Sequence, residues 1–124
     1  LRKDKKFTGF MMDKFLRNKD GEFKIDQEST SSPTYAKDLL MAIKKLIAAN
    51  KKGVFHITNS GTATRYMVAK KMLDVARLNC KLVPVKADFF DSKGYINTGG
   101  LVSKSIKLRP WTQALEEYLR EEWL

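Results

Sequence analysis

The sequence predicts an α/β protein in which short parallel strands alternate with helices. Apolar residues recur at spacings of three and four in several segments, and short runs rich in β-branched and aromatic residues lie between them. The intervening helices are long enough to be crossover connections, which favour parallel pairing. The 124 residues are 43% hydrophobic and 31% charged, which is typical of one small globular unit. Since three short strands make a poor sheet alone, we expect them to belong to a larger sheet.

The first helix is expected from Thr8, whose side chain can cap it, to about Asn18. The Asp-Gly pair at 20–21 is a turn signal, and the alternating residues 22–25 follow it as a short strand.

The second helix carries the strongest apolar periodicity in the chain. It follows a polar loop over 28–34, Thr34 is placed to cap it, and Gly53 is a plausible C-terminal cap. Its apolar residues repeat at three and four: Leu39, Leu40, Ile43, Leu46 and Ile47. The run Val-Phe-His-Ile at 54–57 is then expected to be a buried strand.

The third helix is expected from Thr62 or Thr64 to about residue 78, followed by a strand over 81–85. Pro84 places this strand at an edge or an exposed end of the sheet. Residues 87–100 are expected to be irregular, and Pro110 suits the first turn of a last helix.

The chain is strongly basic. It holds 24 Lys and Arg against 14 Asp and Glu, a net charge of +10, which suggests an anionic partner such as nucleic acid. The basic residues are, however, spread over every helix and interspersed with acids, so a solvated basic surface is the favoured interpretation.

The sequence points to a protein of the cytoplasm, without a membrane segment. No apolar run approaches the roughly 18 residues that a membrane span needs, and the basic N-terminus has no apolar signal core behind it. Cys80 is the single cysteine, which excludes an intrachain disulfide and is compatible with a reducing compartment.

Few residues of the sequence indicate a catalytic or metal-binding site by themselves. His56 is the only histidine, has no second histidine or neighbouring cysteine with which to share a metal ion, and is expected to be a core residue. No G-x-S-x-G, G-x-G-x-x-G or phosphate-loop motif occurs. Tyr66 and Lys70 match the Y-x-x-x-K spacing of an acid–base pair, but the tyrosine falls near the apolar stripe of its helix, so packing explains it better.

An ordered series of motifs covers most of the chain. The segments are Phe7 to Leu16, Ile25-Asp26-Gln27 with Ser32-Pro33-Thr34-Tyr35-Ala36-Lys37-Asp38-Leu39, Gly53 to Gly61, and Leu108-Arg109-Pro110-Trp111 with Ala114-Leu115 and Tyr118-Leu119. In this order they resemble motifs of the dTDP-4-dehydrorhamnose reductases, which are extended short-chain dehydrogenases.

The resemblance implies that residues 1–124 form one unit, the C-terminal substrate-binding portion of such a reductase. The Rossmann-like half that binds NADPH or NADH, with its glycine-rich loop and catalytic Tyr/Lys pair, would lie upstream, so no catalytic residue is expected here. The complete protein would reduce the 4-keto group of dTDP-4-dehydro-6-deoxy-L-mannose, and this portion alone is expected to be inactive. A homodimer and a Mg²⁺ requirement are further expectations from the family. A portion of this kind should expose apolar faces around Leu39, Val54 and Trp111.

The candidate substrate-binding side chains lie on the expected strand-end loops, where α/β proteins place their ligands. They are Gln27, Ser32, Thr34, Asn59, Lys93, Tyr95 and Asn97. The family usually has an Arg-Pro pair near the substrate where this chain reads Ser-Lys-Gly-Tyr-Ile-Asn-Thr at 92–98. Lys93 would meet a diphosphate as a point charge, without arginine's two-pronged geometry. Another nucleotide-sugar reductase or epimerase, a regulatory subunit on the same fold, and a polyanion-binding domain are the alternatives.

Overall fold

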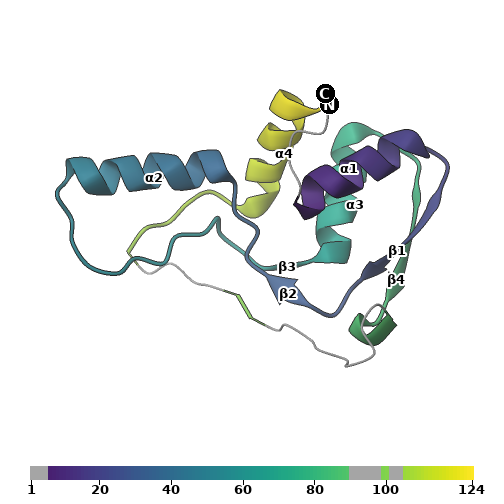
Figure 1. The fold of residues 1–124 in the computed structure, drawn as a ribbon, viewed down its shortest axis with the longest axis horizontal. Helices are drawn as coiled ribbons and strands as arrows, with labels where there is room; N and C mark the ends of the chain where they lie inside the picture. Colours follow the sequence, from purple (N-terminus) through teal and green to yellow (C-terminus); the bar gives the residue numbers. More distant parts are fainter. Residues whose placement is uncertain (1–5, 90–98, 101–104) are drawn as a thin grey trace.

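The computed structural model describes residues 6–89, 99–100 and 105–124, and confirms the α/β class (Figure 1). Its central pairing joins β1 (Glu22–Asp26) to β4 (Lys81–Val85). The two strands are parallel, with Glu22 opposite Lys81 and Asp26 opposite Val85. The exposed Pro84 lies on β4, as expected for an edge position.

Three helices lie together beside this strand pair: α1 (Phe7–Arg17), α3 (Arg65–Ala76) and α4 (Trp111–Glu122) (Figure 1). The core forms where they meet. Met12 and Phe15 of α1, Met72 of α3 and Leu119 of α4 are all fully buried. Phe15 also contacts the strands, because its ring packs edge-on against that of Phe23 on β1, with centroids 5.1 Å apart.

Helix capping follows the sequence prediction at one helix and departs from it at two. Thr64 caps α3 as expected, its Oγ1 accepting a hydrogen bond from the Met67 N–H at 3.1 Å. Helix α1 begins at Phe7, so Thr8 lies inside it. Helix α2 (Ala36–Ala48) begins two residues after Thr34, and the Thr34 hydroxyl donates instead to the Ser32 carbonyl at 3.0 Å.

The strand predicted over 54–57 is wrong. The structure has no strand there, Val54 is 87% exposed, and His56 is exposed rather than part of the core. A strand exists only by hydrogen bonding to a neighbouring strand, and no neighbour reaches this run within the described part of the chain. The expected cap at Gly53 is also wrong, because α2 already ends at Ala48.

Two short strands and a 3₁₀ turn were not predicted from the sequence. β2 (Thr30–Ser31) pairs antiparallel with β3 (Ala63–Thr64), and Ala87–Phe89 forms the 3₁₀ turn after β4. Two-residue strands carry too little pattern to be recognised in a sequence.

The expected exposure of apolar faces holds at Val54, whereas Leu39 is only half-exposed and Trp111 is buried. Trp111 is covered because its indole packs against Gly61: a Cβ at Gly61 would lie 3.0 Å from the Trp111 Cδ1. Gly61 also has φ +93°, a backbone conformation that favours glycine.

Replacing Phe15 by alanine should lower the free energy of unfolding by about 3–5 kcal/mol, because it opens a cavity where α1, α3 and β1 meet. Leu16→Ala is the matched control. Leu16 is the next residue on the same helix but 37% exposed, so its truncation should cost less than about 1 kcal/mol. Urea denaturation measures both, and equal losses would contradict this location of the core.

Candidate functional site

The loop after β1 holds three of the candidate residues: Gln27, Ser32 and Thr34. Its first turn is fixed by Asp26, whose Oδ1 accepts hydrogen bonds from the N–H groups of Glu28 at 2.7 Å and Ser29 at 3.2 Å. Burial by itself would raise the pKa of Asp26, but these hydrogen bonds outweigh it and the pKa is lowered, so the carboxylate stays charged at neutral pH. The exposed Gln27 extends the parallel pairing through its N–H, which donates to the Val85 carbonyl at 3.0 Å.

The middle of this loop meets a distant segment at Gly99 and Gly100. The Thr30 hydroxyl donates to the Gly99 carbonyl at 3.3 Å. Gly100 lies so close to Thr62 that a Cβ there would collide with the Thr62 side chain, and that Cβ would be 3.4 Å from the Ser32 Oγ. Gly99 and Gly100 therefore lie beside this part of the loop. Lys93, Tyr95 and Asn97 lie outside the described residues.

The end of the loop borders a mostly apolar cavity of about 270 Å³. Thr34 lines it, and the exposed Lys6 lies at its edge. The other lining residues come from α1, α3, α4, the first residue of α2 and the loop itself: Thr8, Pro33, Tyr35, Ala36, Val68, Trp111, Ala114, Leu115 and Tyr118. Gln27 and Ser32 are not part of this lining, so the three candidates on the loop do not share one cavity in this structure.

Asn59 is fully buried, and its amide binds neighbouring parts of the chain. Its Oδ1 accepts a hydrogen bond from the Tyr35 N–H at 2.8 Å. Its Nδ2 donates to Asp38 Oδ2 at 2.7 Å and to the Arg109 carbonyl at 3.1 Å. The side chain therefore positions the end of the loop and the start of α2, and does not face solvent.

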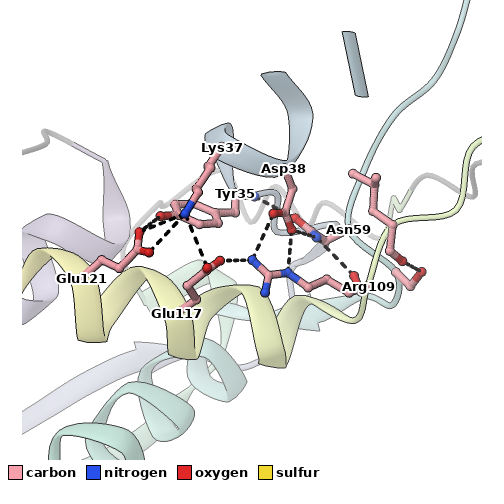
Figure 2. A network of polar contacts seen from close by, with 9 residues as sticks. Tyr35, Lys37, Asp38, Asn59, Arg109, Glu117 and Glu121 are labelled. Carbon is pink, nitrogen blue, oxygen red and sulfur yellow. Dashed lines mark hydrogen bonds and ion pairs between the residues drawn. The ribbon is translucent and has the colours of Figure 1, made fainter. Parts of the chain in front are cut away.

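Figure 2 shows that Asn59 belongs to a larger polar network between α2 and α4. The Arg109 guanidinium binds Asp38 with two hydrogen bonds, Nε to Oδ2 at 2.9 Å and Nη2 to Oδ1 at 3.0 Å, and also pairs with Glu117. Further out, Lys37 pairs with Glu121 at 3.1 Å, and the Tyr35 hydroxyl donates to the same carboxylate at 3.1 Å. The network joins the first turn of α2 to one side of α4.

The network keeps Asp38 and Arg109 charged and Tyr35 neutral at neutral pH. Burial would raise the pKa of Asp38, but the hydrogen bonds from Arg109 and Asn59 outweigh it and the pKa is lowered. The hydrogen bonds from Arg109 to Asp38 and Glu117 raise the pKa of the arginine further. Burial, followed by the hydrogen bond to Glu121, raises the pKa of Tyr35 to about 12, so the tyrosine remains a hydrogen-bond donor.

Sequence reasoning did not find this network, although the quoted motifs contain five of its members: Tyr35, Lys37, Asp38, Asn59 and Arg109. Asp38 and Arg109 both belong to the motifs that carry the family resemblance, but they are 71 residues apart and were not connected. The signal that could have connected them is that both motifs occur in one chain and that Asp38 and Arg109 carry opposite charges.

Parallel strands flanked by helices, with a polar loop at the carboxyl end of β1, form an α/β fold that solved dTDP-4-dehydrorhamnose reductases share. Within that fold the family is clear. Residues 2–123 match the family model described as RmlD substrate binding domain, and the chain belongs to this family. The family resemblance inferred from the motifs is thereby confirmed.

Solved structures of dTDP-4-dehydrorhamnose reductases share the fold at low sequence identity. The enzyme from Yersinia enterocolitica is 22% identical with a TM-score of 0.86, over 94% of this chain and 43% of its own. The one from Bacillus anthracis str. Ames, in complex with NADP, is 22% identical with a TM-score of 0.84, over 95% of this chain and 44% of its own.

The match to a third relative also covers only part of that protein's length. The spore coat polysaccharide biosynthesis protein SpsK of Bacillus subtilis (strain 168) is 28% identical over 106 residues, which are 81% of this chain and 37% of SpsK. The chain thus spans less than half the length of each of these three relatives.

Neither a membrane-spanning helix nor a metal-binding cluster occurs within the described ranges. No helix there is both long and apolar enough to cross a membrane. No group of His, Cys, Asp and Glu residues among them is arranged to hold a metal ion, so the Mg²⁺ expectation has no support in this part of the chain.

Asp38→Asn should lower the free energy of unfolding at pH 7 by about 1–3 kcal/mol, because it removes the more buried of the two carboxylates that pair with the partly buried Arg109. The folded-state pKa of Asp38 is lowered, so its stabilising effect is present above the unfolded pKa of about 3.9. That effect is lost as the pH falls through the folded pKa. The difference between the two proteins should therefore shrink below pH 4, as urea denaturation across pH 2–7 would measure.

Asp13→Asn is the control for this experiment. Asp13 pairs with Arg17 on the exposed side of α1, so its replacement should cost less than about 0.5 kcal/mol. A pH-independent loss in Asp38→Asn would contradict the ionic role assigned to Asp38.

Proposed function

We propose that this chain is the substrate-side portion of an NAD(P)H-dependent reductase acting on the 4-keto group of dTDP-4-dehydro-6-deoxy-L-mannose. The observation that carries the proposal is the match of residues 2–123 to the RmlD substrate binding domain family. The fold shared with dTDP-4-dehydrorhamnose reductases supports it.

The loop over 27–34 is the proposed sugar-nucleotide contact. Gln27 is exposed, Ser32 is half-exposed, and Thr34 is one of the residues that line the apolar cavity. Amide and hydroxyl groups both donate and accept hydrogen bonds, which is what sugar hydroxyls require. Lys93, Tyr95 and Asn97 are proposed to supply the second side of the site, since their segment leads into Gly99 and Gly100 beside this loop. Asn59 would act beneath the site by holding Tyr35 and Asp38.

The nicotinamide cofactor is assigned to residues outside this chain. The 124 residues contain no G-x-G-x-x-G turn, and the described helix starts follow no glycine-rich loop that could approach a pyrophosphate. When bound elsewhere, the cofactor would supply the hydride. The complex of the Bacillus anthracis relative with NADP favours the phosphorylated form of the cofactor. This portion alone is therefore proposed to bind the sugar nucleotide without reducing it.

The residues at 92–98 differ from the Arg-Pro pair that the family usually has there. Because of this difference, a related nucleotide sugar is the second candidate for the substrate. A lysine offers a diphosphate one flexible charge, so this side of the site selects less strictly than an arginine would. A reductase or epimerase acting on another nucleotide sugar would use the same loop.

Titration of the ¹⁵N-labelled chain with dTDP-L-rhamnose should shift the amide signals of Gln27, Ser32 and Thr34 in a saturable way. UDP-glucose is the control ligand, and smaller shifts with it would support selection of the dTDP sugar. Stronger binding of UDP-glucose would favour the second candidate. No saturable shift on this loop with either ligand would overturn the proposed site.

Thr34→Val should weaken dTDP-L-rhamnose binding by about five- to tenfold, because it removes one hydroxyl at nearly constant volume. Thr112→Val is the control, since Thr112 is half-exposed in the first turn of α4 and does not line the cavity. Isothermal titration calorimetry measures both, and equal affinities would remove Thr34 from the site.

A further inference from the structure

Among the candidate residues that the structure describes, none carries a positive charge. They offer only amide and hydroxyl groups: Gln27, Ser32, Thr34 and Asn59. These groups suit sugar hydroxyls, but a nucleotide sugar also carries a diphosphate, which cationic side chains bind most strongly. The fold brings an exposed arginine, Arg65, beside the same loop.

Arg65 is the first residue of α3 and follows a strand that pairs with the loop. In the pairing of β2 with β3, Thr30 of the loop lies opposite Thr64, the residue before Arg65. Figure 1 shows β3 leading from this pair directly into α3. Gly100 lies close to Thr62, two residues before Thr64. The backbone of Arg65 is therefore fixed at the place where the loop, β3 and Gly100 meet.

An aromatic ring restrains the side chain of Arg65. The guanidinium carbon Cζ lies over the Phe7 ring, 5.5 Å from the ring centroid. The ring attracts the positive charge without offering an oxygen acceptor to the guanidinium N–H groups. Because the side chain is already restrained, its ordering adds less to the entropy that binding a ligand costs.

Asp26 lies near Arg65 but is not its ion-pair partner. Burial would raise the pKa of Asp26, whereas the hydrogen bonds from Glu28 and Ser29 and then the charge of Arg65 lower it. The Asp26 Oδ1 accepts the backbone N–H groups of Glu28 and Ser29, at 2.7 and 3.2 Å. Within the described ranges, the Arg65 guanidinium makes no ion pair and donates no hydrogen bond. Its N–H groups thus remain available to an anion.

We infer that Arg65 binds the diphosphate of the sugar nucleotide, with its guanidinium donating two parallel hydrogen bonds to phosphate oxygens. This inference rests on the proposed function and deepens it by assigning a charged residue to the same site. The planar guanidinium suits the role because its N–H groups match the spacing of two phosphate oxygens. The loop beside it then contacts the sugar through Gln27 and Ser32.

Lys6 is a second cation in this region, since it directly precedes Phe7 and lies at the edge of the apolar cavity. Its ammonium group is a point charge on a flexible side chain, and it cannot form the two-pronged contact. Arg65 therefore fits a diphosphate better than Lys6 does.

Arg65→Gln should weaken dTDP-L-rhamnose binding by about tenfold or more, because it removes the charge and the two-pronged donor. Arg65→Lys should recover only part of the affinity, because it restores the charge alone. Arg77→Gln is the matched control, since Arg77 is an exposed arginine directly after the other end of α3, and it should bind like the unmodified chain. Isothermal titration calorimetry measures all three. Unchanged affinity in Arg65→Gln, or full recovery in Arg65→Lys, would overturn the inference.

Salt dependence separates a direct charge contact from a structural effect of the substitution. Raising the salt from about 50 to about 500 mM should weaken binding by the unmodified chain more than binding by Arg65→Gln, which lacks the charge that salt screens. Equal salt dependence would overturn the inference, as would a larger loss of affinity in Lys6→Gln than in Arg65→Gln. If Arg65 only stabilised Asp26, Arg65→Gln would lower the free energy of unfolding in urea and leave the affinity unchanged.

Inorganic pyrophosphate tests Arg65 without the nucleoside or the sugar. In the ¹⁵N-labelled chain it should shift the Nε signal of Arg65 in a saturable way and leave that of Arg77 in place. Absence of this shift, together with dTDP-L-rhamnose shifts at Gln27, Ser32 and Thr34, would overturn the inference and leave the proposed function standing. A pyrophosphate shift at Arg65 in a chain that does not bind dTDP-L-rhamnose would support the anion site and contradict the proposed function.

Discussion

The two-pronged ion pair between Asp38 and Arg109 is the constraint on which the rest of the structure depends. Asp38 is only 12% exposed in its side chain, so its charge is costly unless its partners are complete. Arg109 and Asn59 complete them. The backbone around the arginine is fixed as well: the Ser60 N–H donates to the Arg109 carbonyl at 3.1 Å, and the Trp111 N–H donates to the Ser60 carbonyl at 3.0 Å. Three segments distant in the sequence thereby meet at one place.

This arrangement fixes the candidate loop at both ends. At its start, Gln27 continues the pairing of β1 with β4. At its end, the Tyr35 N–H binds the buried Asn59. The residues between these two points pair with β3 and contact Gly99 and Gly100. A loop anchored in this way can present Gln27, Ser32 and Thr34 with little loss of entropy when a ligand binds.

The sequence predicted those features that a local pattern determines. The helices around Phe15, Met72 and Leu119, the strands over 22–25 and 81–85, and a cap at Thr62 or Thr64, of which the structure uses Thr64, all follow from periodicity and side-chain chemistry within a few residues. The Asp38–Arg109 pair joins residues 71 apart and has no local signal. Trp111 was expected to be exposed and is buried, because its cover is Gly61, on a turn 50 residues earlier. The error at 54–57 has another cause: those residues do favour a strand, but a strand needs a second strand beside it.

Of the candidate residues, the sequence placed Gln27, Ser32 and Thr34 on one loop correctly, and gave no sign that Asn59 would be buried beneath it.

The apolar run at 54–57 affects how readily molecules of the 124-residue chain aggregate. Val, Phe and Ile in close succession, with Val54 almost fully exposed, form the kind of short segment that adds strands between molecules and leads to aggregation. Lys51 and Lys52 directly precede this run, and such flanking charges act as gatekeepers, because stacking copies would bring their ammonium groups together. Lys51 and Lys52 would thus help to keep the chain in solution, and high salt would weaken that protection.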